Sequence, residues 1–337
     1  LIPVFWMSNK QDFGLIPQLV YGDAVQRVTE LEQLHQVGVL KPTESFAGLK
    51  ALTVPFVAAG GGMEAWKFVT LAFCMMAGTA SLPHILMRYF TTPSVKSARR
   101  SVAWSLFFIF LLYFTAPALA TFTKLQILDP NLATGIIGKT IAEVNAIEWI
   151  QKWSAVKFLA ISDSNGDGIL QINEFFMRGD IVVLATPEIA GLPYVISGLV
   201  AAGGMAAAMS TADGLLLAIA NALSHDLYYK IIDPAAETAK RLIVARVLLV
   251  VLGAAGAFVA SLKLTSILGA VAWAFDFAMS GLFFPLVLGV WWKRANRQGA
   301  VAGMFCGFLA GTWYLYMVRW GGMEPWLGID HLRFGII

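Results

Sequence analysis

Six long apolar runs constrain what this chain can fold into. At 1.5 Å per residue, each is long enough to cross about 30 Å of hydrocarbon as a helix. The period-two alternation typical of a membrane barrel is absent from the sequence. We therefore predict an all-α integral membrane protein. The six expected spans are residues 65–90, 102–122, 192–223, 242–262, 267–292 and 300–318.

The composition supports this class and argues against others. Of the 337 residues, 58% are hydrophobic and 13% are charged, whereas about 25% of residues are charged in soluble domains. A net charge of +3 gives no basic field for binding nucleic acid. Cys74 and Cys306 both fall inside apolar runs, where small core residues are expected. No set of nucleophile, base and oxyanion donors is visible, so we do not expect an enzyme.

Charges in the connecting loops predict the orientation of the spans. Residues 88–100 and 293–297 carry Lys and Arg but no acid, and short loops of this kind face the cytoplasm. Residues 123–190, with more acids than bases, then lie outside. We expect a multi-pass protein of the bacterial inner membrane. The chain divides into the end of a preceding span with an outer loop (1–64), two spans (65–122), an outer loop (123–190), four spans (191–320) and an outer tail (321–337).

The outer loop contains a motif typical of calcium-binding loops. The stretch DSNGDGILQINE, residues 163–174, matches the EF-hand pattern, with Gly168 at the sharp turn. The preceding residues favour an incoming helix, whereas Gly179 would keep an outgoing helix short. We predict a structural Ca²⁺ site, and the alternative is an acidic turn that only matches the pattern. The predicted ligands are Asp163, Asn165, Asp167, the Ile169 carbonyl, Gln171 through a water molecule, and Glu174.

A small residue and two hydroxyls share one face of the third span. Ala207, Ser210 and Thr211 are spaced i, i+3 and i+4 on a helix. Sodium prefers oxygen ligands, and neutral hydroxyls supply them without burying a fixed negative charge. The alternative is a helix-packing seam, because Gly203, Ala207 and Thr211 are spaced four apart. The pattern alone leaves both interpretations open.

Three stretches resemble the sodium/solute symporter family. The run MSTADGLLLAIANALSHDLYYK is similar to a family helix in which a Ser-Thr pair precedes an Asp-Leu-Tyr cytoplasmic end. LPHILMRYFTTPSVKSARRS resembles the segment after the broken helix in the acetate-permease-like branch, and FFPLVLGVWWKRANRQGAVAG resembles a later helix pair. The resemblance covers residues 65 to 320. It implies a Na⁺ site formed by the Ala207 carbonyl and the hydroxyls of Ser210 and Thr211, completed by a helix earlier than this chain begins.

The resemblance also implies a LeuT-type architecture of two inverted five-helix repeats. The first five spans would be the second repeat, the sixth an appended helix, and the first repeat would be absent from this chain. The first span should then be discontinuous, and the small residues from Gly78 to Ser81 followed by Pro83 agree with this. Freed backbone groups at Gly78, Thr79 and Ser81 would meet a carboxylate substrate. The alternative is a proline kink held by packing.

The expected function is that of a sodium-coupled symporter of a small organic anion, a monocarboxylate, working by alternating access in the lipid bilayer. The alternative is a transporter-like sensor coupled to a signalling kinase, which would need a signalling domain beyond the last span. Two acids lie inside the predicted spans, Asp213 and Asp276, and intramembrane acids are functional candidates. Asp213 would serve as a relay or be paired within the bundle. Asp276 could instead be hydrated near the outer interface.

Overall fold

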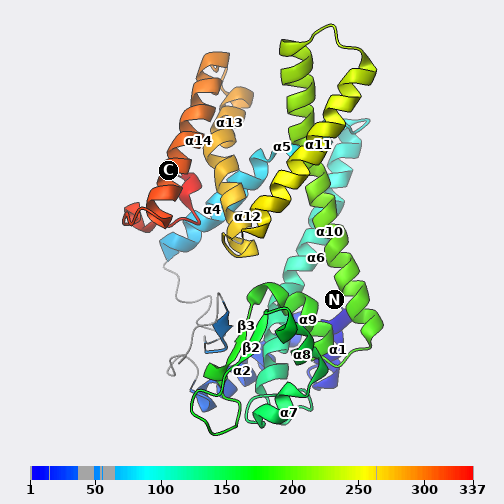
Figure 1. Ribbon diagram of the computed structural model, residues 1–337, viewed down its shortest axis with the longest axis vertical. Helices are drawn as coiled ribbons and strands as arrows, with labels where there is room; N and C mark the ends of the chain where they lie inside the picture. Colours follow the sequence, from blue (N-terminus) through cyan, green and yellow to red (C-terminus); the bar gives the residue numbers. More distant parts are fainter. Residues whose placement is uncertain are drawn as a thin grey trace. The chain divides into compact units, whose positions relative to one another are not determined.

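The computed structural model describes residues 2–14, 16–36, 49–53, 55, 65–262 and 264–336. Much of the loop predicted within residues 1–64 lies outside the described residues. The chain forms two compact units (Figure 1). The first unit comprises residues 1–62 and 99–206, and the second comprises residues 63–98 and 207–337.

The first unit is a helical body with a small antiparallel sheet. Its strands are β1 (Lys50–Ala51), β2 (Leu159–Ile161) and β3 (Phe175–Met177), in the order β1-β3-β2. The register pairs Ala160 and Ala51 with Phe176. Phe175 and Phe176 are fully buried, because aromatic side chains suit a central strand with a covered face. The helices are α1 (Ile2–Lys10), α2 (Pro17–Leu34), α7 (Ile141–Asn145), α8 (Glu148–Ala155) and α9 (Val182–Ile189).

The segment predicted as a long outer loop is therefore a folded part of this unit. Apolar side chains from α2, from the end of α6 and from residues 136–190 share one core that includes Val28, Phe122 and Phe175. Lys124 forms an ion pair with Glu32 at 2.5 Å inside this unit. Packing against α2 and α6 orders this segment. The sequence of the segment alone did not indicate that it would be ordered.

Five helical segments among the described residues are long and apolar enough to cross a membrane, which confirms the all-α membrane class. Many of their large side chains, such as Phe107 and Phe110, are exposed, as expected of surfaces that face lipid or further helices. The five are α6 (Val95–Leu128), α10 (Tyr194–Asn221) continued by a π-helix (Ala222–Ile232), α11 (Thr238–Ser261), α12 (Ile267–Ala278) continued by a π-helix (Met279–Phe283) and α13 (Phe284–Trp291), and α14 (Arg297–Arg319).

The first predicted span is not one continuous helix. It consists of α4 (Ala65–Ser81) and α5 (Pro83–Phe90), which are separated at Leu82. Proline lacks the amide proton that would continue the helical ladder and is favoured at the first position of a new helix. The expected discontinuity is thus present, and the 8 residues of α5 are too few to span a bilayer alone.

The second unit is built around the contact of α4 with α12. A Cβ at Gly78 would overlap the Phe275 carbonyl oxygen, so the two backbones touch. The chain after α14 folds back as two 3₁₀ turns, Trp326–Gly328 and Phe334–Ile336, and its end lies beside α14 (Figure 1). This C-terminal segment, residues 326–336, covers the ends of α4 and α12.

Candidate functional site

The residues predicted to bind sodium lie together on α10. Ala207, Ser210 and Thr211 are all exposed, and the Thr211 hydroxyl donates to the Ala207 carbonyl oxygen at 3.2 Å. Helical periodicity alone places them on one face. The face therefore presents two hydroxyl oxygens, together with the Ala207 carbonyl oxygen, which already accepts the helical amide of Thr211 as well as its hydroxyl. Three oxygens are fewer than a sodium ion needs, so further ligands would have to come from elsewhere.

The residues predicted to bind substrate lie at the end of α4, and two of the three make packing contacts. Gly78 allows the close approach of α4 to α12. The buried Ser81 hydroxyl lies within hydrogen-bond distance of the Gly78 carbonyl, at 3.0 Å, and of the Ala278 carbonyl on α12, at 3.1 Å. Thr79 is exposed, and its hydroxyl donates to the Met75 carbonyl at 2.6 Å. The break is therefore held against α12, and Thr79 is the exposed member of the set, with its hydroxyl proton already donated to Met75.

An apolar cavity of about 790 Å³ opens beside the break between α4 and α5. Pro83 and His84 line it from the break, and Ile219 lines it from α10. Phe277 and Phe308 line it from α12 and α14. His84 contributes a buried ring nitrogen, Nδ1, that has no hydrogen-bond partner. The cavity is large enough for a small organic molecule, and this ring nitrogen is a polar group at its wall.

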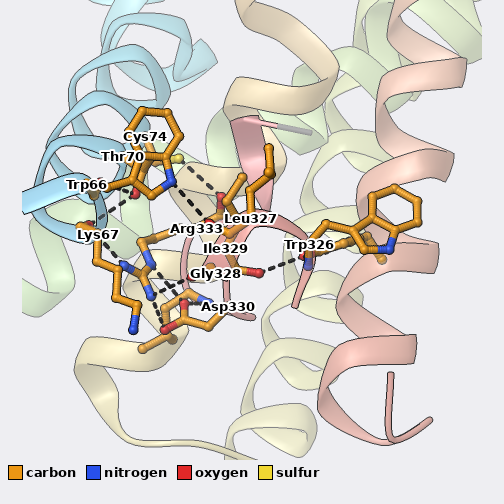
Figure 2. A network of polar contacts seen from close by, with 12 residues as sticks. Trp66, Lys67, Thr70, Cys74, Trp326, Leu327, Gly328, Ile329, Asp330 and Arg333 are labelled. Atoms are coloured by element: carbon orange, nitrogen blue, oxygen red, sulfur yellow. Dashed lines mark hydrogen bonds and ion pairs between the residues drawn. The ribbon is translucent and has the colours of Figure 1, made fainter. Parts of the chain in front are cut away.

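The C-terminal segment is tied to α4 and α14 by a network of polar contacts (Figure 2). The Trp66 indole donates to the Leu327 carbonyl at 3.1 Å, and the Arg333 guanidinium donates to the Lys67 carbonyl at 3.0 Å. Arg333 also forms an ion pair with Asp330. Sequence reasoning placed this segment in an outer tail and missed the network. A signal was available, because Trp66 and Trp326 end two near-identical hexapeptides, GGMEAW and GGMEPW.

Asp276, on α12, is in contact with this segment at Gly335. Its side chain is fully buried, so the expectation that it would be hydrated is wrong. Packing of α4 and of the C-terminal segment excludes water from a position that sequence alone could not place. Neither carboxyl oxygen has a hydrogen-bond partner. Asp213, by contrast, is exposed on α10.

The calcium-type loop is closed by its own hydrogen bonds. The Asp163 carboxylate accepts the amides of Gly166 and Gly168 at 2.8 and 3.2 Å. Asn165 accepts the amide of Asp167 at 3.0 Å. The Asp167 carboxylate accepts the Ile169 amide at 2.8 Å, together with the side-chain amides of Asn165, at 2.8 Å, and Gln171, at 3.0 Å. These bonds engage the side-chain oxygens of Asp163, Asn165 and Asp167 within the same short turn.

Glu174 stands apart from the other predicted ligands. It is fully buried, and its two oxygens accept the amides of Ser164 at 2.9 Å and Gln171 at 3.1 Å. No cluster of three His, Cys, Asp or Glu side chains that could hold a metal is found in the part of the chain that the structure describes. The loop therefore has the donor types of a calcium site, but its closing acid is committed to the backbone.

The flanks of this loop differ from the expected helix. The predicted incoming helix, residues 146–162, is present only as α8 (Glu148–Ala155); β2 then leads into the loop, and a 3₁₀ turn (Ile172–Glu174) followed by β3 leads out. Pairing of β2 with β3, residues 159–161 with 175–177, decides this. Extended pairing of two short apolar segments buries them against the core of the first unit, which a helix of the same length would not do.

Comparison with known proteins confirms the resemblance seen in the sequence. Residues 181–307 match the sequence model of the sodium:solute symporter family. An uncharacterized symporter of Cupriavidus necator is 46% identical over 278 residues, which cover 80% of this chain and 40% of the relative. The monocarboxylic acid transporter of Corynebacterium glutamicum is 26% identical over 252 residues, 74% of this chain and 38% of the relative. The chain thus spans about two fifths of these relatives. No solved structure matches it.

Proposed function

We propose that the complete protein, whose residues 181–307 belong to the sodium:solute symporter family, is a sodium-coupled symporter of a small organic anion. The observation that carries the proposal is the exposed oxygen-bearing face of α10, formed by Ala207, Ser210 and Thr211. Neutral oxygen ligands can hold a hard cation such as Na⁺ without burying a fixed negative charge. Its remaining ligands would come from other helices of the complete protein.

We place this transporter in a LeuT-type architecture that works by alternating access. The support is the discontinuous helix pair α4 and α5, whose break at Leu82 lies where the second inverted repeat of such a fold requires one. In this scheme α14 is the appended helix. For the location we propose the bacterial inner membrane. The apolar helices and the two bacterial relatives, which are named a symporter and a transporter, support this.

The sodium site is tested by removing its hydroxyls from the complete protein. Replacing Ser210 and Thr211 together with Ala should abolish the stimulation of solute uptake by sodium in proteoliposomes. Thr312→Ala is the matched control, because Thr312 is also an exposed helical hydroxyl that donates to the carbonyl four residues earlier, at 2.7 Å. Sodium stimulation that survives in the double variant would refute the assignment.

The proposed solute is a monocarboxylate. The apolar cavity of about 790 Å³ would hold its carbon skeleton, and the backbone at the break, together with the positive end of α5, would bind its carboxylate. The name of the relative from Corynebacterium glutamicum points to the same class. Uptake of labelled monocarboxylates, with dicarboxylates and neutral sugars as competitors, tests this. Competition by the sugars alone would exclude an anionic solute.

For the loop of residues 163–174 we propose a structural Ca²⁺ site. Asp163, Asn165, Asp167 and the Ile169 carbonyl would hold the ion, with Gln171 reaching it through water. Glu174 would join only by giving up its backbone amides, so we assign it first to loop closure. A site of this kind works at about 10⁻⁴ to 10⁻³ M in extracellular modules, which suits a loop outside the membrane.

A further inference from the structure

Asp276 is a buried acid that the proposed transport cycle does not use. Its side chain has 0% exposure, and both carboxyl oxygens lack a hydrogen-bond partner. It lies in the apolar helix α12, between α4 and the C-terminal segment. An ionised carboxylate in such a place loses its hydration without replacement, which costs far more than burying the neutral acid. Burial therefore favours the neutral form of the side chain in this arrangement.

The C-terminal segment is what closes the site. A Cβ at Gly335 would lie 2.8 Å from the Asp276 backbone and 2.9 Å from Oδ1, so only glycine permits this approach. The groups near the carboxyl group are the Cys74 thiol, which donates instead to the Arg333 carbonyl at 3.5 Å, and the backbone amides of Phe334 and Gly335, none of them at hydrogen-bond geometry to the carboxyl oxygens. These are donors, not the ring of oxygens that a metal cation requires. Because none of these donors reaches the carboxyl oxygens, nothing replaces the hydration that an ionised carboxylate would lose on burial.

The other titratable groups on the elements packed against Asp276 have contacts of their own, and these groups include Lys67 on α4. On the C-terminal segment, Arg333 pairs with Asp330 and donates to the Lys67 carbonyl. On α14, the buried Tyr314 hydroxyl donates to the Ile329 carbonyl at 2.7 Å. The π-helix that follows α12 (Met279–Phe283) contains no titratable residue. His331 packs its ring on Trp273 and is the one neutral-range rival for a pH effect.

We infer that Asp276 is a proton-binding residue that takes up a proton when residues 326–336 dock on α4 and α12 and releases it when they leave. When residues 326–336 leave, the Asp276 carboxyl group meets water and ionises. When they dock, burial favours its neutral form. Docking therefore consumes one proton. It is favoured at acid pH and weakened as the pH rises. This proton site does not depend on which solute or coupling ion the protein carries.

Hydrogen exchange of the complete protein in lipid nanodiscs tests the inference. After correction for the intrinsic exchange rate, the protection of the Phe334 and Gly335 amides should fall with rising pH. The expected slope is about tenfold per pH unit, that of one proton, over the range in which the docked side chain is protonated and the released one is not. Protection that does not change with pH in the unmodified protein would overturn the inference.

Variants identify the group responsible. Asp276→Asn, which resembles the neutral acid, should keep the segment protected at every pH. Glu324→Gln, a matched change at an exposed carboxylate near the segment, should retain the slope, as should His331→Gln. Loss of the slope in His331→Gln would assign the effect to histidine and overturn the inference. If Asp276→Asn does not fold, the unmodified protein compared with the other two variants still decides the question.

Discussion

Gly78 on α4 and Phe275 on α12 touch through their backbones, because a Cβ on Gly78 would overlap the Phe275 carbonyl oxygen. This contact holds the end of α4 against α12. The Ser81 hydroxyl, 3.1 Å from the Ala278 carbonyl, reinforces the same contact one turn later. Two residues that the sequence offered as substrate ligands thus set the geometry beside which a substrate would bind.

Gly78→Ala should separate α4 from α12. The added methyl group meets backbone atoms that cannot rotate away, so we expect a loss of about 1–3 kcal/mol in stability and reduced uptake. Thermal unfolding of the purified protein measures the first effect. Gly256→Ala on α11 is the control, because its added Cβ would meet nothing within 4 Å. Equal unfolding temperatures for the two variants would contradict the tight contact.

Tyr314→Phe should loosen the C-terminal segment. The buried Tyr314 hydroxyl accepts the Trp326 amide at 2.9 Å and donates to the Ile329 carbonyl at 2.7 Å. Its removal leaves two backbone groups unpaired, at a cost of about 1–3 kcal/mol for a buried group. Hydrogen exchange at Trp326 should therefore quicken. Tyr316→Phe, on an exposed position of the same helix, should leave it unchanged, and an identical response in both variants would argue against the network.

The loop that contains Asp167 should stay ordered well into the acid range. The backbone amide of Ile169 holds the pKa of the Asp167 carboxyl below its ordinary value of 3.8, and the side chains of Asn165 and Gln171 act in the same direction. The ionised form thus stabilises the closed loop. That contribution is complete above about pH 3.8 and is lost as the pH falls through the lowered pKa. Exchange of the Ile169 amide, followed from neutral to acid pH, should show a late loss of protection that Asp167→Asn lacks.

Calcium should bind the loop weakly and stabilise it. We expect a dissociation constant of about 10⁻⁴ to 10⁻³ M by titration calorimetry, and an unfolding temperature that rises with calcium. Asp167→Asn should weaken binding while an amide oxygen still accepts the Ile169 amide. Asp180→Asn, outside the loop, is the control. Glu174→Ala is a poorer probe, because its oxygens hold the amides of Ser164 and Gln171 whether or not calcium is bound. If titration at millimolar calcium shows no heat of binding, the loop is a turn without a calcium site.

Local chemistry made several features predictable from the sequence alone. Long uncharged runs have few alternatives to membrane helices, because every backbone polar group must be paired in hydrocarbon. Pro83 removes an amide from its own helix, so the break near Leu82 needed no tertiary information. The 3.6-residue period places Ala207, Ser210 and Thr211 on one face wherever the helix lies. These properties belong to short stretches of chain.

Contacts between segments far apart in the sequence decided the rest. Gly78 and Ser81 pack on α12 because of residues almost 200 positions away, and pairing with β3 makes residues 159–161 a strand. Asp276 is buried because Gly335 returns to within contact distance of it after the whole of α14. Burial and pairing depend on which surfaces meet, and no local pattern records that. The sequence therefore determined the spans and the oxygen-bearing face, whereas the tertiary structure determined which polar groups lost contact with water.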